Sequence, residues 1–394
     1  MHARLIFGFL RRTFTYLLAV LAVSAFTQVS AQHYLQTNLV SDVPGRAAVT
    51  DPDLVNPWGL VASPTSPWWV ANNGTGTSTL YTGAGVKVPL TVTIPTAVGG
   101  TPPSAPTGVV FNGNIADFDG ARFIFVTEDG TISAWSGGTM AVLKYTNPTT
   151  AIYKGATIAN VNGANFLYVA NFFNGTVDVF NTSFSPTFVP AGAFTDPNIP
   201  EGFAPFNVQE LNGNIFVAFA KQDEAKEDEE AGAGLGFADI FDANGNLLLR
   251  LRSGPWMNAP WGVALAPDDF GKESGRLLVG QFGSGEIATF DLKHGNFHGL
   301  LRGRFGQPLT IEGLWAIRFG NGAGAGPTNT LFFTAGTDDE AHGLFGAITS
   351  WDNGKNHPKE LNSIQMKSGG NQVPVRSVVL KGGSPVSDRS KRQM

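Results

Sequence analysis

The sequence of 394 residues contains no cysteine. This absence excludes disulfide bonds, thiolate metal sites, a cysteine nucleophile and a lipid-anchoring cysteine. Stability must therefore come from a packed core, for which 42% apolar residues, including 30 Phe and 8 Trp, supply the side chains. Histidine is also sparse, with six in the chain. A zinc or iron site built from several histidines is therefore not expected.

Long apolar runs are missing as well. The strongest run lies between Thr13 and Phe26 and is too short to cross a membrane comfortably. It follows three arginines and precedes Val29-Ser30-Ala31, a small-x-small cleavage site. We therefore predict an export signal in residues 1–31 and a protein without a membrane span. Its location would be the periplasm or the outside of the cell.

Positive charge is in short supply. Without the three arginines of the predicted signal, 23 basic residues remain against 31 acidic ones. This excess of negative charge argues against a nucleic-acid partner. Residues 353–394 are the exception, with eight basic and two acidic residues. We predict that they form a polar, mostly mobile tail.

A short sequence motif, which we call the repeated phrase, recurs six times along the chain. Its third positions lie 47 to 55 residues apart. Each copy is followed by short apolar or alternating runs that are typical of strands. Six modules of this length predict an all-β, six-bladed propeller of four-stranded blades over residues 32–352. The clear copies are Pro57-Trp58-Gly59-Leu60, Pro106-Thr107-Gly108-Val109 and Pro260-Trp261-Gly262-Val263, and the degenerate copies begin at Tyr153, Pro205 and Leu314.

The sixth module is one strand short. Five modules are each followed by a run that reads as an outer strand, but the sixth ends near Trp351 after three strands. An alternating segment from Tyr34 to Val40 precedes the first module. We predict that this segment is the missing outer strand and closes the ring, with a free N-terminal arm as the alternative. The five outer strands are predicted at residues 86–94, 140–145, 188–194, 247–252 and 297–302.

Two stretches resemble known propeller proteins. Asn165-Phe166-Leu167-Tyr168-Val169-Ala170-Asn171, with the following Gly175-Thr176-Val177-Asp178-Val179-Phe180, is similar to an NHL-type repeat. Asp51-Pro52-Asp53-Leu54-Val55-Asn56-Pro57-Trp58-Gly59, together with Ala220-Lys221-Gln222-Asp223, resembles a family of uncharacterised secreted bacterial propeller proteins. The resemblance implies a six-bladed propeller outside the cytoplasm with no assigned activity. The wider group includes metal-dependent hydrolases, lyases and binding modules, so the fold alone does not choose a function.

Polar residues recur where such a propeller exposes its central channel. The turns between second and third strands lie on the same face as the starts of the first strands. Their oxygen donors suit a hard cation such as calcium, the one cofactor that the sequence suggests. The candidate ligand-binding residues at these positions are Asn56, Asn72, Glu128, Asp129, Asn171, Asn207 and Gln281.

Asn72, Glu128 and Asn171 occupy matching positions in consecutive blades and are the predicted metal ligands. A metal there would activate water against a lactone or ester, with Glu128 or Asp129 as ligand or base. The alternative is that these residues only form turns, because Asn and Asp before glycine tolerate left-handed backbone angles.

Two further features lie on the same predicted face. Trp58, Trp261 and Trp315 recur at one position of the phrase, where they would stack on a ligand or, as their repetition favours, pack neighbouring blades together. The acidic run from Asp223 to Gly232 lies in a loop of the fourth module. We expect a solvated loop there, with ordering around calcium or a basic partner as the alternative.

The sequence shows no convincing catalytic set. No serine lies in a nucleophile-elbow pattern, and the glycine-rich stretches lack the context of a phosphate cradle. We therefore favour a monomeric, non-catalytic binding module that uses its channel face for a small molecule, a cation or a protein. The alternatives are a calcium-dependent lactone or ester hydrolase of gluconolactonase-like type and a cell-envelope scaffold protein.

Overall fold

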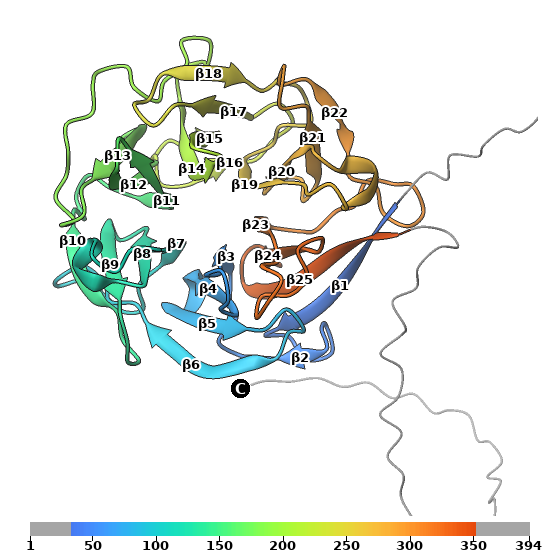
Figure 1. The fold of residues 1–394 in the computed structure, drawn as a ribbon, viewed down its shortest axis with the longest axis horizontal. Coiled ribbons are helices and arrows are strands. Elements are labelled where there is room, and N and C mark those ends of the chain that lie inside the picture. The colour runs from blue at the N-terminus through green and yellow to red at the C-terminus, as the bar shows by residue number, and fades with distance from the viewer. Residues whose placement is uncertain (1–32, 352–394) are drawn as a thin grey trace, which may run out of the picture. The chain divides into compact units, whose positions relative to one another are not determined.

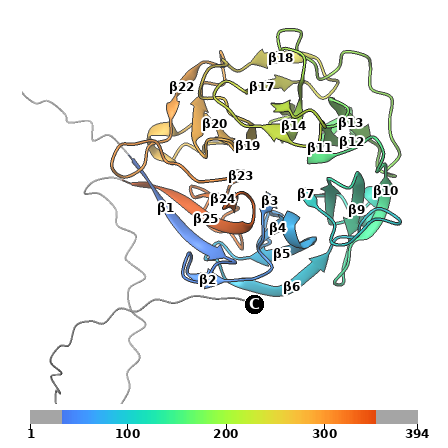
Figure 2. The ribbon, with the colours of Figure 1, turned by 180° about the vertical axis from the view of Figure 1, so that it is seen from behind.

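A computed structural model describes residues 33–351 of the chain. Their strands form six sheets arranged around a central axis (Figures 1 and 2). This arrangement confirms the predicted all-β, six-bladed propeller. The predicted export signal in residues 1–31 and the predicted tail in residues 353–394 lie outside the described residues. No helix within residues 33–351 is long and apolar enough to cross a membrane.

The first three blades follow one another in chain order, each with its inner strand at the channel. Blade 1 consists of β3 (Pro57–Val61), β4 (Trp68–Asn72), β5 (Thr77–Tyr81) and β6 (Lys87–Thr93). Blade 2 consists of β7 (Pro106–Phe111), β8 (Phe123–Thr127), β9 (Thr131–Trp135) and β10 (Val142–Thr146). Blade 3 consists of β11 (Tyr153–Val161), β12 (Ala164–Asn171) and β13 (Thr176–Phe180).

The other three blades complete the ring. Blade 4 consists of β14 (Phe203–Leu211), β15 (Asn214–Gln222), β17 (Gly236–Phe241) and β18 (Leu247–Arg250), with the short β16 (Glu229–Glu230) beside β15. Blade 5 consists of β19 (Pro260–Leu265), β20 (Leu277–Gln281), β21 (Ile287–Phe290) and β22 (Phe297–Leu300). Blade 6 consists of β23 (Leu314–Phe319), β24 (Leu331–Thr337), β25 (His342–Trp351) and β1 (His33–Ser41), to which β2 (Val49–Thr50) adds in parallel.

The N-terminal strand β1 closes the ring. It pairs antiparallel with β25, so the first and last strands of the propeller share one blade (Figure 1). Tyr34 anchors the strand, because its hydroxyl donates to the Phe270 carbonyl at 3.0 Å and accepts the Glu273 amide at 3.0 Å. The predicted closure is confirmed, and it covers the edge of β25 that would otherwise be bare.

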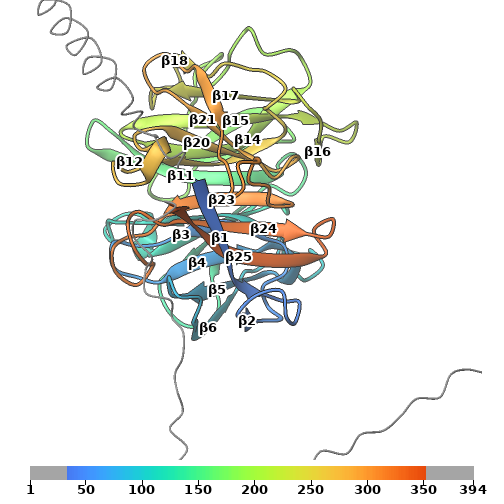
Figure 3. The same ribbon diagram turned by 90° about the vertical axis from the view of Figure 1, so that its right-hand side faces the viewer.

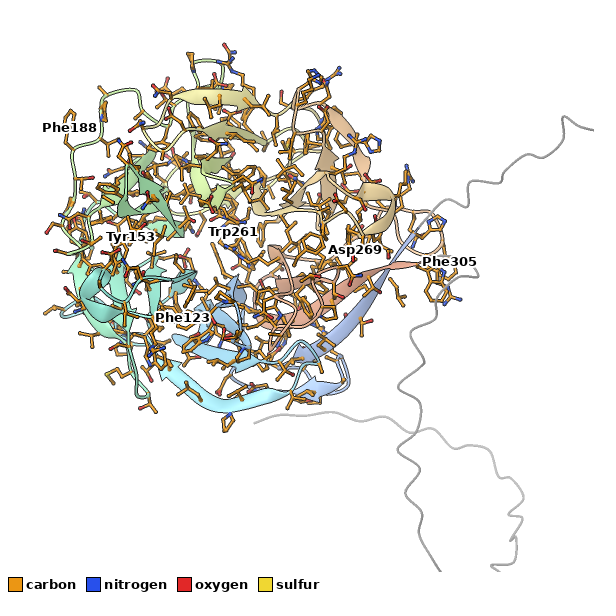
Figure 4. The ribbon with its side chains drawn as sticks, viewed as in Figure 1. Phe123, Tyr153, Phe188, Trp261, Asp269 and Phe305 are labelled. Atoms are coloured by element: carbon orange, nitrogen blue, oxygen red, sulfur yellow. The ribbon has the colours of Figure 1, made fainter. Side chains whose placement is uncertain are left out.

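Blade 3 lacks the outer strand predicted at residues 188–194. Only an isolated bridge between Phe180 and Pro186 continues the sheet beyond β13. Pro186 and Pro190 have no N–H to donate, so the segment is poorly suited to a ladder. Phe188 is 90% exposed and lies at the periphery of the ring (Figure 4). The prediction of a strand here is wrong.

The glycine of the repeated phrase allows neighbouring inner strands to approach closely. A Cβ added at Gly59 would lie 2.6 Å from the carbonyl oxygen of Thr107 in the next blade. A Cβ added at Gly155 would overlap the side-chain oxygen of Asn207. The recurring glycine is therefore required by the narrow radius of the ring and not only by turn geometry.

We expect Gly155→Ala to lower the free energy of unfolding by about 1–3 kcal/mol, because the new methyl group overpacks the contact between blades 3 and 4. Chemical denaturation measures the change. Gly137→Ala is the matched control, since a Cβ there meets no atom within 4 Å, and its effect should stay within about 0.5 kcal/mol. Equal stability of the two variants would contradict the packing role.

Candidate functional site

Aromatic side chains close the central channel. Trp58 stacks on Trp315 with 3.4 Å between ring centroids and meets Trp261 edge-on at 6.1 Å. Phe206 packs against them, 6.2 Å from Trp58. All four stand at the second position of the repeated phrase, and none is more than 4% exposed. Figure 4 shows Trp261 close to the centre of the ring. We call these four residues the aromatic plug; its packing leaves almost none of Trp58 or Trp261 accessible to a ligand.

In blade 3 the second position of the phrase is a lysine. The Lys154 side chain is fully buried, and its Nζ lies 5.2 Å from the ring centroid of Trp58 and 5.7 Å from that of Phe172. These distances are within the range of a cation–π interaction. Nζ also donates to Asp228 Oδ1 at 2.9 Å and to Glu128 Oε1. The ammonium therefore rests on the aromatic plug and points towards carboxylates.

Burial opposes the charge of Lys154, but the carboxylates of Glu128, Asp228 and Glu229 outweigh burial and raise the pKa of the lysine above its usual value. Lys154 is therefore a permanent positive charge. A charge in this position is stable only while its acidic partners remain ionised.

Four carboxylates from three blades surround Lys154. Glu128 follows β8, Asp228 and Glu229 lie in the loop between β15 and β17, and Glu340 follows β24. We call them the mouth carboxylates, and the end of the channel that they surround the acidic mouth. They outnumber the single ammonium, which leaves this end of the channel with surplus negative charge.

Burial and mutual repulsion raise the pKa values of two of the mouth carboxylates, Glu229 and Glu340. Burial raises the pKa of Glu229 to about 8, and the neighbouring charges of Glu340 and Asp228 add to the rise while Lys154 opposes it. Burial also raises the pKa of Glu340, although Asn56 donates a hydrogen bond to it. At neutral pH, Glu229 is therefore mostly protonated.

Two asparagines connect the mouth carboxylates to blade 1. Asn73 donates to Glu128 Oε2 at 2.7 Å, and Asn56 donates to Glu340 Oε2 at 2.5 Å. The side-chain oxygen of Asn56, Oδ1, accepts the indole N–H of Trp315 at 3.1 Å. Of the predicted candidates, Asn56 and Glu128 thus lie together at the acidic mouth, joined to the aromatic plug by a hydrogen bond.

The acidic run from Asp223 to Gly232 folds towards the same mouth. Its strand β16 pairs with the end of β15, with Glu230 opposite Lys221. Figure 3 shows β16 projecting on one side of the ring. Because Asp228 in this loop binds Lys154, the loop is ordered around a basic residue of the same chain. Residues 224–228 are nevertheless exposed, as expected for a solvated loop.

Asn72 and Asn171, two of the predicted metal ligands, are held inside their own blades. Both are fully buried. The amide group of Asn72 donates to Thr79 at 2.9 Å, and that of Asn171 donates to Asp178 at 2.9 Å. The side-chain oxygen of Asn72, Oδ1, has no hydrogen-bond partner among the described residues. One unpaired oxygen does not make a cation site.

Glu128, the third predicted ligand, is already paired with a cation. Its two carboxylate oxygens accept from Lys154 and Asn73. Calcium needs six to eight oxygen ligands. Across residues 33–351, no group of three or more His, Asp or Glu side chains is arranged to hold a metal ion. The donor set at this mouth therefore does not fit calcium.

The three remaining candidates bind backbone groups. Asp129 accepts the Ala105 amide at 2.9 Å. Asn207 donates to the Trp261 carbonyl at 2.8 Å, which ties blade 4 to blade 5. Gln281 accepts the Asn258 amide at 2.9 Å. Their contacts in the structure are those of residues that fix loops and inner strands.

A second cluster of acidic groups lies in blade 4, away from the channel. Asp239 on β17 is 2% exposed. Burial raises its pKa to about 8, and the nearby carboxylate of Asp196 adds to the rise. Arg250 binds both oxygens of Asp196, at 2.5 and 2.8 Å. Asp239 is therefore protonated at neutral pH and hydrogen-bonded to Asp196.

Replacement of Lys154 with Met should destabilise the fold by about 3 kcal/mol or more near pH 8, because Glu128 loses its buried counter-charge. The loss should shrink near pH 5, because Glu229 and Glu340, whose pKa values burial raises, are then protonated and need less counter-charge. Urea unfolding at the two pH values measures both effects. Lys144→Met, which removes a surface pair with Asp119, is the control, with an expected loss of about 1 kcal/mol or less. A loss no larger than this control would contradict the role of Lys154.

Asp239→Asn should make the protein more stable relative to the wild type as the pH rises. The folded-state pKa of Asp239 is about 8 and the unfolded value is about 4, so the folded protein holds one more proton between them. The wild type therefore loses stability from this group across that window, and the Asn variant does not. Denaturant unfolding across the window measures the difference. A constant difference at all pH values would show that Asp239 is ionised in the folded protein.

Comparison with known proteins identifies relatives of this chain, but those relatives have no assigned activity. No model of a known protein family matches the sequence. An uncharacterized protein of Acanthamoeba polyphaga mimivirus is 31% identical over 332 residues, which cover 79% of this chain and 78% of that protein. A second uncharacterized protein of the same virus is 31% identical over 336 residues, which cover 79% of this chain and 84% of that protein.

A solved structure of a protein of unknown function from Bacteroides thetaiotaomicron aligns with a TM-score of 0.53 and 12% identity, over 81% of this chain and 76% of that chain. This likeness supports the fold alone. The expected kinship with secreted bacterial propeller proteins stays a prediction, because the two sequence relatives named above are viral. Since the similarity extends over most of each chain, the protein belongs to one family with these uncharacterized mimivirus proteins.

Proposed function

We propose that this protein is an exported, non-catalytic binding propeller whose acidic mouth takes a cationic ligand. The ligand would carry an amine or guanidinium group on a small molecule or on a segment of a protein. The observation that supports this proposal is the surplus of mouth carboxylates over the single Lys154 ammonium. Export rests on the signal predicted in residues 1–31.

The surrounding loops favour the same class of ligand. The turns between second and third strands share the face of the acidic mouth, and their charged side chains are almost all acidic. Such a surface attracts cations from solution and raises their rate of association, most strongly at low salt. The additional acidic residues in these turns are Asp129, Asp223, Glu224, Glu227, Glu230, Glu286, Asp338 and Asp339.

The raised pKa of Glu229 links binding to pH. A cation bound beside Glu229 favours the ionised carboxylate and so displaces its proton. Because the pKa of Glu229 is about 8 without a ligand, affinity for a cation should increase as the pH rises towards that value. Binding should release protons over the same range.

The gluconolactonase-like alternative has less support. Its expected ligand or base is Glu128, which both Lys154 and Asn73 engage. A general base must be free to accept a proton from water within hydrogen-bond reach. The binding function therefore explains the arrangement of the mouth better than hydrolysis does.

Calorimetric titration with a tri-lysine peptide tests the proposal. We expect binding that weakens with salt and becomes roughly tenfold tighter between about pH 6 and pH 8, since one carboxylate must ionise. Glu229→Gln should remove this pH dependence. The same peptide with acetylated side chains should not bind, because it lacks the positive charges.

Asp268→Asn is the matched control, since Asp268 is exposed in the loop between β19 and β20, on the opposite face. It removes one negative charge without touching the acidic mouth, so binding should stay unchanged. Absence of binding, or binding equally affected by both variants, would rule out the acidic mouth as the cation site.

A further inference from the structure

The opposite end of the channel holds a second positive charge, Arg318. It lies on the inner strand β23, two residues after Ala316, the third position of the sixth phrase. Together with Gln209 and the inner-strand glycines, it lines a small cavity of about 10 Å³ in the channel. This volume is about the size needed to hold one water molecule. We call this end of the channel the arginine mouth.

Arg318 differs from Lys154 in having no partner. Among residues 33–351, no hydrogen bond or ion pair engages its guanidinium group. Burial lowers the pKa of Arg318 to about 10, and Glu210 on β14 opposes the shift from a distance. The group is therefore still charged at neutral pH. Glu210 itself accepts the Gly213 amide at 2.5 Å.

The neighbouring inner strands offer Arg318 little to bind. The corresponding positions in the other blades are occupied mostly by small or apolar side chains. Thr157 is engaged with the Glu210 amide at 2.9 Å, and the Gln209 side-chain amide donates to the Val263 carbonyl at 3.0 Å. The corresponding residues are Val61, Val110, Thr157, Gln209 and Ala264.

An unpaired guanidinium in this position is costly. It carries five N–H donors in a fixed fork and has no acceptor of its own. A partly buried charge without a partner is unfavourable, and an anion that accepts from the fork removes that cost. Three other blades hold an apolar residue at the corresponding position, namely Val61, Val110 and Ala264.

We propose that Arg318 forms an anion site at the arginine mouth and binds a monovalent anion. A carboxylate matches the guanidinium fork, while a halide ion matches the water-sized cavity beside it. Glu210 lies near enough to influence Arg318 and disfavours anions of higher charge. The site uses none of the mouth carboxylates, so it stands independently of the proposed function.

Thermal unfolding of the full chain in different anions tests the site. Acetate or chloride would replace a bulky organic sulfonate at constant ionic strength, from about 10 mM to about 300 mM. We expect at least one of the two to raise the Tm of the wild type by about 2 °C or more, because a ligand that binds only the folded state stabilises it. A response to acetate alone identifies a carboxylate ligand, and a response to chloride alone identifies a halide ligand.

Arg318→Gln should abolish this anion response. Arg122→Gln, an exposed arginine in the loop between β7 and β8 on the same face, should keep it. An identical response of all three proteins, or none in the wild type, would overturn the proposal. If Arg318→Gln does not fold, NMR of chloride and of carbon-13 acetate with the wild type decides: broadening of either resonance supports the site, and absence of broadening of both contradicts it.

Discussion

The close contact between Lys154 and the aromatic plug is the constraint on which the centre of this propeller depends. Narrow inner-strand spacing, made possible by glycine at the third position of the phrase, brings the second-position side chains together in the channel. Of the six second positions, four hold the aromatic residues of the plug, one holds Thr107 and one holds Lys154. Its buried charge requires carboxylates, and these come from blades 2, 4 and 6.

The two ends of the channel then acquire different chemistry. At the acidic mouth, carboxylates exceed the one ammonium, and Glu229 keeps its proton at neutral pH. At the arginine mouth, a guanidinium has no partner among the described residues. The aromatic plug separates the two ends, so a ligand at one mouth need not contact the other. A channel closed in this way offers no passage through the ring, so the ligands proposed above would bind at its mouths.

The fold was predictable because it repeats. Six copies of a phrase at near-equal spacing indicate six blades, and the strand missing from the last copy identifies the role of Tyr34 to Val40. The outer strand predicted at residues 188–194 is absent. The apolar pattern of this segment resembles a strand, but Pro190 has no N–H to donate to a neighbouring strand. The site was less predictable. Lys154 is visible as the one basic residue at the second position, but the approach of Glu229 and Glu340 depends on loop conformations that no sequence spacing records.

The protonation state of Glu229 is the most direct test of the acidic mouth. Carbon-13 NMR of the glutamate side-chain carboxyl groups, followed across pH, reports each titration separately. One resonance should titrate near pH 8 in the wild type and disappear in Glu229→Gln. If every glutamate instead titrates near the ordinary value of about 4.3, the mouth carboxylates are not crowded, and the proposed coupling of cation binding to the proton on Glu229 is contradicted.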